Sequence, residues 1–162
     1  GAAVLGGVTI KIAVYKVGLT FSQAFVLGIL CNWLVCLAVW MATGAKDITG
    51  KILAIFFPIW LFITSGFEHC VANMYYIPAG ILAKNNPALA EAATALGVTA
   101  EQLNHLSWGT FFVNNLIPVT LGNIVGGGVF VAAVYWLVYI KNAKTKAKKP
   151  DLDSESELQK AV

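Results

Sequence analysis

Hydrophobic residues fall in long runs along this chain, and the first complete run covers residues 22–43. It reads "SQAFVLGILCNWLVCLAVWMAT", and only Gln23 and Asn32 interrupt its interior with polar side chains. A bilayer core about 30 Å thick needs about 20 apolar residues in helical conformation. The run therefore predicts a membrane-spanning helix, and Ser22 is the expected N-cap.

A second apolar region, residues 52–83, is divided by polar residues. "ILAIFFPIWLFIT" is too short to span a bilayer alone, "SGFEH" interrupts it, and "CVANMYYIPAGILA" is apolar again. Irregular backbone at membrane depth is tolerated only where it is buried in protein or lines a watery cavity. The pattern predicts a discontinuous transmembrane helix with a pore loop at residues 65–70.

The other segments complete a multi-pass pattern. Residues 1–15 begin without an initiator Met and are typical of the end of a preceding helix with its outer loop, so we expect a fragment of a longer protein. Residues 84–107 are polar and predict an extracytoplasmic loop with one short Ala-rich helix. Residues 115–140 predict a final transmembrane helix, and the charged residues 141–162 predict a disordered cytoplasmic tail.

Composition and charge support a membrane protein and give its orientation. Of 162 residues, 58% are hydrophobic and 12% charged, and the mean hydropathy is +0.74, whereas soluble domains carry about 25% charged residues. Five lysines after the last apolar run suit either a nucleic-acid patch or the positive-inside rule. The second is favoured because the cluster abuts a membrane segment. We expect a protein of the cytoplasmic (inner) membrane with its C-terminus inside and no nucleic-acid partner. The lysines are Lys141, Lys144, Lys146, Lys148 and Lys149.

His69 is the leading candidate for function, because an ionisable group near the bilayer centre costs about 3 kcal/mol on insertion scales. Its alternative is a structural histidine bonded to a backbone carbonyl. Desolvation disfavours the charged ring, whereas a passing anion favours it. The adjacent Glu68 cannot share a helical face with His69 and is expected to brace the broken backbone.

No metal or cofactor site is expected. "HCVAN" does not match the HExxH zinc pattern, and His69 has no partner ligands nearby in the sequence. Cys31, Cys36 and Cys70 lack CxxC spacing and are interpreted as small buried hydrophobes.

The segment "TLGNIVGGG" leaves two roles open for Asn123, which are helix packing and pore lining. Gly122 and Gly126 have the small-xxx-small spacing of closely packed membrane helices. The aromatic residues before and in the break are expected mainly to contact lipid and core, and one or two of those close to the break are candidates for an apolar constriction that excludes hydrated ions. They are Phe56, Phe57, Trp60, Phe62 and Phe67.

Three motifs in this order resemble the formate/nitrite transporter family: "GILCNWLVCLAVWMA", "SGFEHCVANMYYIPAG" and "NLIPVTLGNIVGGG". The resemblance implies an all-α membrane protein with an aquaporin-like helical bundle. It also implies six helices in each protomer and a homo-pentamer with a separate pore in each protomer. This chain would then supply about half of one protomer.

The resemblance further implies roles for individual residues. His69 would be the central pore histidine, Asn123 its polar companion and Phe62 part of the inner constriction. Glu68 would belong to the loop network, and Lys16 would lie at the outer mouth.

The expected function is a channel for small monovalent anions. Formate is the leading substrate, and nitrite and hydrosulfide are the alternatives. The histidine is expected to couple transport to protons.

A membrane enzyme using Glu68 and His69 as an acid/base pair is the alternative from another class. It would need a nucleophile or cofactor ligands, and the sequence offers neither, so we do not expect an enzyme. A structural anchor subunit is disfavoured by the histidine-bearing break.

Overall fold

The computed structural model describes residues 1–141, and every regular element within them is a helix. The predicted tail, residues 141–162, lies outside the described residues apart from Lys141. Residues Trp108–Lys141 form one continuous rod, called the final helix below. The helices before it are α1 (Ala2–Val17), α2 (Phe21–Gly44), α3 (Ile48–Thr64), α4 (Cys70–Ala83), α5 (Pro87–Ala95) and α6 (Ala100–His105). The final helix itself contains two α-helical parts, α7 (Trp108–Thr110) and α8 (Ile117–Ile124), and three π-helical segments, η1 (Phe111–Leu116), η2 (Val125–Ala133) and η3 (Trp136–Lys141).

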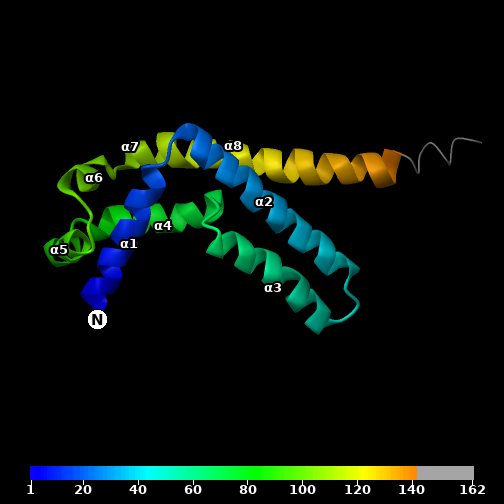
Figure 1. The fold of residues 1–162 in the computed structure, drawn as a ribbon, viewed down its shortest axis with the longest axis horizontal. Helices are drawn as coiled ribbons and strands as arrows, with labels where there is room; N and C mark the ends of the chain where they lie inside the picture. The colour runs from blue at the N-terminus through cyan, green and yellow to red at the C-terminus, as the bar shows by residue number, and fades with distance from the viewer. Residues whose placement is uncertain (142–162) are drawn as a thin grey trace, which may run out of the picture.

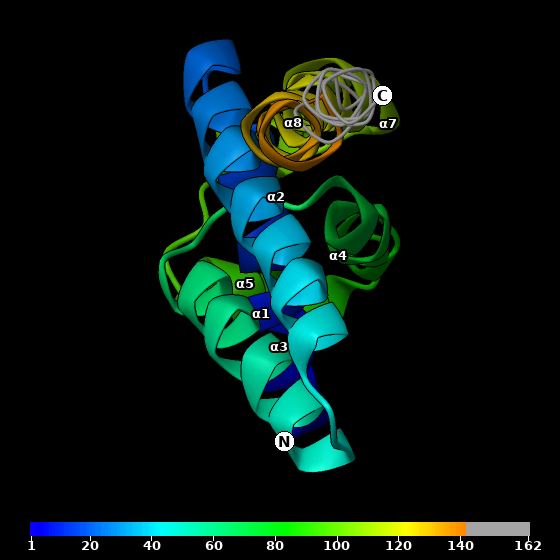
Figure 2. The same cartoon turned by 90° about the vertical axis from the view of Figure 1, so that its right-hand side faces the viewer.

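Two of the described helices are long and apolar enough to cross a membrane. They are α2, with 24 residues, and the final helix, with 34 residues. Figure 1 shows them crossing near the label α8 and then diverging, and α3 runs back alongside α2. Figure 2, viewed from the end at which they diverge, shows α3 and the final helix on opposite sides of α2.

The second apolar region is a discontinuous helix, as the sequence predicted. In Figure 1, α3 and α4 are separate rods that meet at a turn and point in different directions. Gly66 in this turn has a φ of +68°, a conformation that glycine adopts without a Cβ penalty. The helical path therefore ends at Thr64 and resumes at Cys70.

The start of α2 differs from the predicted N-cap. Thr20, not Ser22, caps the helix, and its Oγ1 accepts a hydrogen bond from the Gln23 backbone N–H at 3.3 Å. The Gln23 side chain accepts in return from the Thr20 N–H at 3.0 Å. This reciprocal capping box satisfies two backbone donors, whereas Ser22 would satisfy one.

The final helix begins at Trp108, well before the predicted residue 115. Ser107 caps it, because its Oγ accepts from the Thr110 N–H at 3.2 Å. Asn114 and Asn115 suggested a boundary by their polarity, but both lie inside the helix, in the π-helical segment η1. The prediction was wrong because tertiary hydrogen bonds, described below, satisfy the amide of Asn115 within the helix.

Glycines allow α2 and α8 to lie in direct backbone contact. A Cβ built on Gly122 would meet the Phe25 carbonyl oxygen at 2.2 Å, and one on Gly126 would meet the Ile29 carbonyl oxygen at 2.2 Å. Gly128 differs, because a Cβ there would meet nothing within 4 Å. The small-xxx-small pair is thus used within this chain, and Gly128 faces away from the contact.

Residues 84–107 form two short helices rather than a loop with one. α5 and α6 pack on α1, which also packs on α4, and the common core includes Ile10, Ile77, Ala93 and Leu106. Lysines hold both short helices by their C-terminal carbonyls. Lys11 donates to the Leu96 oxygen at 2.8 Å, and Lys84 donates to the oxygens of Leu103 and Leu106.

The glycine contact can be tested with one substitution placed at two positions. Gly122→Ala should destabilise the protein by about 1–3 kcal/mol, because its Cβ overlaps backbone rather than a flexible side chain. Gly128→Ala is the matched control and should be neutral or stabilising by up to about 1 kcal/mol, since alanine favours helix. Thermal unfolding of both variants in detergent measures these changes in stability. Equal melting temperatures would show that α2 and α8 do not pack as described.

Candidate functional site

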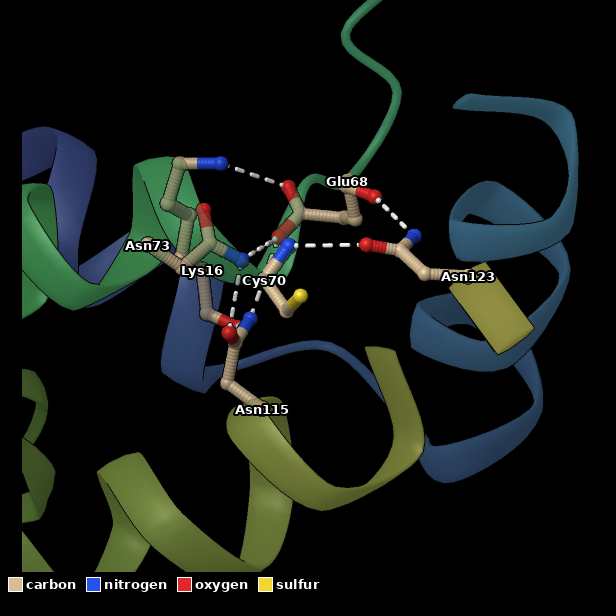
Figure 3. A network of polar contacts seen from close by, with 6 residues as sticks. All are labelled: Lys16, Glu68, Cys70, Asn73, Asn115 and Asn123. Carbon is tan, nitrogen blue, oxygen red and sulfur yellow. Dashed lines mark hydrogen bonds and ion pairs between the residues drawn. The ribbon is translucent and has the colours of Figure 1, made fainter. Parts of the chain in front are cut away.

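The candidate site surrounds the break between α3 and α4. Figure 3 shows side chains converging on it from α1, α4, η1 and α8, which are distant in sequence. The break itself supplies Glu68 and His69.

The Glu68 carboxylate is fully engaged inside the protein. Its residue is 1% exposed, and its Oε1 accepts a hydrogen bond and ion pair from Lys16 Nζ at 2.8 Å. Its Oε2 accepts from Asn73 Nδ2 at 2.6 Å and from Asn115 Nδ2 at 3.1 Å. Removing a carboxylate from water is unfavourable unless it is paired and hydrogen-bonded, and here both conditions hold. The arrangement agrees with a bracing role for Glu68.

Asn73 and Asn115 are site residues that the sequence reasoning missed. Both are completely buried, and Asn73 Nδ2 donates to Asn115 Oδ1 at 2.7 Å. Asn115 Nδ2 also donates to the Lys16 backbone oxygen at 2.9 Å, which joins η1 to the end of α1. Their signal in the sequence was the same as that of Asn123, an asparagine inside an apolar helix, but nothing in the pattern linked them to Glu68.

Asn123 ties the break to α2 and α8. Its Oδ1 accepts from the Cys70 N–H at 3.0 Å, and its Nδ2 donates to the carbonyl oxygens of Gly28 at 2.8 Å and Glu68 at 3.0 Å. Cys70 is the first residue of α4, where backbone N–H groups lack intrahelical partners. Both polar atoms of its amide thus bond backbone groups, which fits the packing role of Asn123, and its pore-lining role stays a prediction.

His69 caps α4 and lies beside Phe62. Its Nδ1 accepts from the Val71 N–H at 3.2 Å, so in the neutral ring Nε2 carries the donor hydrogen. The Phe62 and His69 rings are 6.1 Å apart between centroids. Phe67, His69 and Phe62 are all half-buried, and the Phe67 N–H donates to the Phe62 oxygen at 3.0 Å. The structure therefore brings the histidine and both candidate aromatic residues to one place.

Lys16, the residue expected at the outer mouth, pairs with Glu68. Its side chain is 14% exposed, and its Nζ is 5.9 Å from the centroid of the Tyr76 ring. Lys16 and Glu68 are 52 residues apart in sequence, so no local pattern predicts the pair. Their opposite charges form an ion pair, so neither stands as an isolated charge beside the break.

Within residues 1–141, no group of three or more His, Cys, Asp or Glu side chains lies close enough together to hold a metal ion. At the break, the imidazole of His69 lies beside the Phe62 ring and at the N-terminus of α4, where its ring nitrogens can form hydrogen bonds.

Residues 2–137 match the family described as formate/nitrite transporter. The chain is 50% identical over 139 residues to a probable formate transporter of Methanothermobacter thermautotrophicus, covering 85% of this chain and 43% of that protein. It is 44% identical over 132 residues to the formate channel FocA of Escherichia coli K12, covering 82% of this chain and 46% of FocA. The chain thus spans about half the length of the curated relatives it matches.

Solved structures agree with the sequence comparison. A pentameric formate channel with formate bound superposes with a TM-score of 0.73 at 49% identity, covering 84% of this chain and 53% of that one. An ion channel of the same family gives a TM-score of 0.62 at 34% identity, covering 81% and 45%. The match extends from α1 through nearly all of the final helix, and on this basis the chain belongs to the formate/nitrite transporter family.

Proposed function

We propose that the protein conducts small monovalent anions, formate above all, as part of a six-helix protomer in a homo-pentamer. The observation that carries the proposal is the helix break, which sets the His69 imidazole beside Phe62 between two apolar half-helices. Relatives named as formate channels and a pentameric structure with formate bound support the choice of substrate and assembly.

The electrostatics of the break suit an anion that must pass without being trapped. The N-terminus of α4 carries the partial positive charge of a helix dipole, which favours anions. Lys16 and Glu68 cancel as a pair, so no unpaired fixed charge of the network holds the anion. His69 Nε2–H supplies one hydrogen-bond donor to an anion that has lost water at the aromatic residues.

Proton exchange at His69 would determine whether formate leaves or enters the cell at a given pH. A formate anion that takes a proton from the imidazolium form of His69 crosses an apolar constriction as neutral formic acid, and the neutral imidazole left behind regains a proton from water. Without a proton, an anion entering a cell with an interior negative by 100 mV is opposed by about 2.3 kcal/mol. We therefore expect potential-driven efflux near neutral pH and proton-linked uptake in acid.

The distribution of lysines supports a cytoplasmic C-terminus. At one end of the molecule, Lys11 and Lys84 donate to backbone carbonyls and Lys16 pairs with Glu68. Lys46 and Lys51, near the opposite end, are exposed, and the sequence after the final helix adds the lysine cluster. By the positive-inside rule, the side with more basic residues near the ends of the membrane helices is the cytoplasmic one.

Catalysis by Glu68 and His69 is disfavoured by the hydrogen bonds of the carboxylate. A general base must reach the proton that it abstracts. Both Glu68 oxygens are instead occupied by Lys16, Asn73 and Asn115 in a site that is 1% exposed. Transport therefore explains the histidine better than an acid/base pair does.

Anion flux into vesicles containing the purified protein tests the proposed substrate. We expect formate to permeate faster than nitrite and hydrosulfide, and all three to exceed acetate, because a larger anion meets the aromatic residues. Stopped-flow fluorescence with a pH-sensitive dye inside the vesicles measures the four rates. Formate flux equal to that of protein-free vesicles would overturn the proposal, and faster nitrite or hydrosulfide flux would reassign the substrate.

His69→Asn tests proton coupling, because asparagine keeps a hydrogen-bonding side chain but does not titrate. The variant should retain part of the efflux at neutral pH and lose the acid-stimulated uptake of formate. His105→Asn changes the only other histidine, which is exposed at the end of α6, and should behave as wild type. A wild-type pH profile in His69→Asn would mean that His69 has only its capping role.

Phe62→Ala tests the constriction. Loss of the ring beside His69 should raise acetate flux relative to formate flux at least about tenfold, the effect of removing roughly 1.4 kcal/mol from a barrier. Phe56→Ala, on the same helix but with a ring stacked on Trp60 and 54% exposed, is the matched control. An unchanged acetate-to-formate ratio would place Phe62 outside the permeation path.

A further inference from the structure

Asn32 is a polar residue in the middle of the apolar helix α2, and it contacts the backbone of a residue that holds the break. Its side chain is half-buried, and its Nδ2 donates a hydrogen bond to the Asn123 backbone oxygen of α8 at 2.7 Å. A carbonyl oxygen has two lone pairs, so it can accept this bond in addition to one from its own helix. The amide of Asn32 therefore links α2 to the backbone of Asn123.

Asn123 is held by two consecutive turns of α2. Gly28, four residues before Asn32, accepts from Asn123 Nδ2 at 2.8 Å, and residues four apart lie on the same face of a helix. One turn of α2 thus holds the side chain of Asn123, and the next turn holds its backbone. Figure 3 shows this side chain extending beside α2 towards Glu68 and Cys70.

Gly127 leaves room for the Asn32 amide at a change of helix type. A Cβ built on Gly127 would lie 2.7 Å from Asn32 Nδ2 and 2.8 Å from Cys36 Sγ, which is too close for atoms that are not bonded. The α-helical part α8 ends at Ile124, and the π-helical segment η2 begins at Val125. π-helical segments are rare and lie frequently at functional sites. The Asn32 bond fixes the backbone immediately before this change.

We propose that Asn32 is a positioning residue for transport. By holding the backbone of Asn123, it aims the Asn123 amide at the Glu68 carbonyl and the Cys70 N–H. His69 lies between these two residues in the chain, so the position of its ring depends on both bonds. The proposal rests on the proposed function, whereas the geometry that it requires can be measured without transport. Helix packing alone is the competing explanation, because polar side chains often join membrane helices.

Hydrogen–deuterium exchange of the whole purified protein tests the geometry. Asn32→Leu removes the donor, keeps a side chain of similar size and makes α2 more apolar, so membrane insertion is not impaired. The Cys70 N–H should then exchange about two- to tenfold faster, the range expected for weakening of one hydrogen bond. Asn32→Gln keeps an amide donor and should restore slow exchange. Unchanged exchange at Cys70 in Asn32→Leu would overturn the proposal.

A double-mutant cycle and a matched control separate this effect from packing. Gly127→Ala should displace the Asn32 amide and speed exchange at Cys70 to a similar extent, but it should add nothing in an Asn32→Ala background, because both changes act on one bond. Thr43→Val removes a hydroxyl of α2 that donates to the Trp40 oxygen of its own helix, and should leave exchange at Cys70 unchanged. Additive effects in the cycle, or faster exchange in Thr43→Val, would show that the break responds to general loosening of α2 and would refute the role of Asn32.

The pH profile of formate flux tests the consequence for transport. Asn32→Leu should lower acid-stimulated uptake relative to efflux at neutral pH by a factor comparable to the change in exchange, and Asn32→Gln should restore the ratio. Fewer folded molecules would lower both rates in proportion and leave the ratio unchanged. A wild-type ratio in Asn32→Leu, with faster exchange at Cys70, would refute positioning for transport. A wild type that conducts no formate would overturn the proposed function instead, whatever the exchange at Cys70.

Discussion

Backbone N–H and C=O groups that a helix break exposes at membrane depth have no water to bond, and they must find partners inside the protein. In this chain, Asn123 binds the Cys70 N–H and the Glu68 carbonyl, and His69 binds the Val71 N–H. The Glu68 N–H donates to the Leu27 oxygen of α2 at 3.3 Å. A few side chains and one neighbouring helix therefore make the irregular turn tolerable, and the position of the histidine follows from them.

Burial of the Glu68 carboxylate imposes a second constraint, on how the helices are joined. The charge is compensated only if Lys16 of α1, Asn73 of α4 and Asn115 of η1 all meet it. A buried ion pair contributes little net stability against an apolar replacement, but loss of one partner leaves an uncompensated charge and costs about 3–5 kcal/mol. The network thus fixes one arrangement of the three helices rather than strengthening the fold in general.

The sequence predicted those features that local patterns encode. The lengths of the apolar runs predicted the long helix α2 and the two half-helices around the break. Three sequence motifs predicted the family. It did not predict that Lys16 meets Glu68, because 52 residues separate them and periodicity carries no information about distant partners. The start of the final helix was misplaced for the same reason, since the buried partners of Asn115 come from other helices.

The crossing of α2 and α8 has a mechanical consequence. The two long helices are in direct backbone contact at Gly122 and Gly126, whereas beyond this point they meet through large side chains such as Trp40 and Tyr135. Asn123 lies at the backbone contact and holds the Glu68 carbonyl and the Cys70 N–H. Backbone groups in direct contact have less freedom to shift than side chains that can change rotamer. The turn that carries His69 is therefore attached where the two long helices are held most closely.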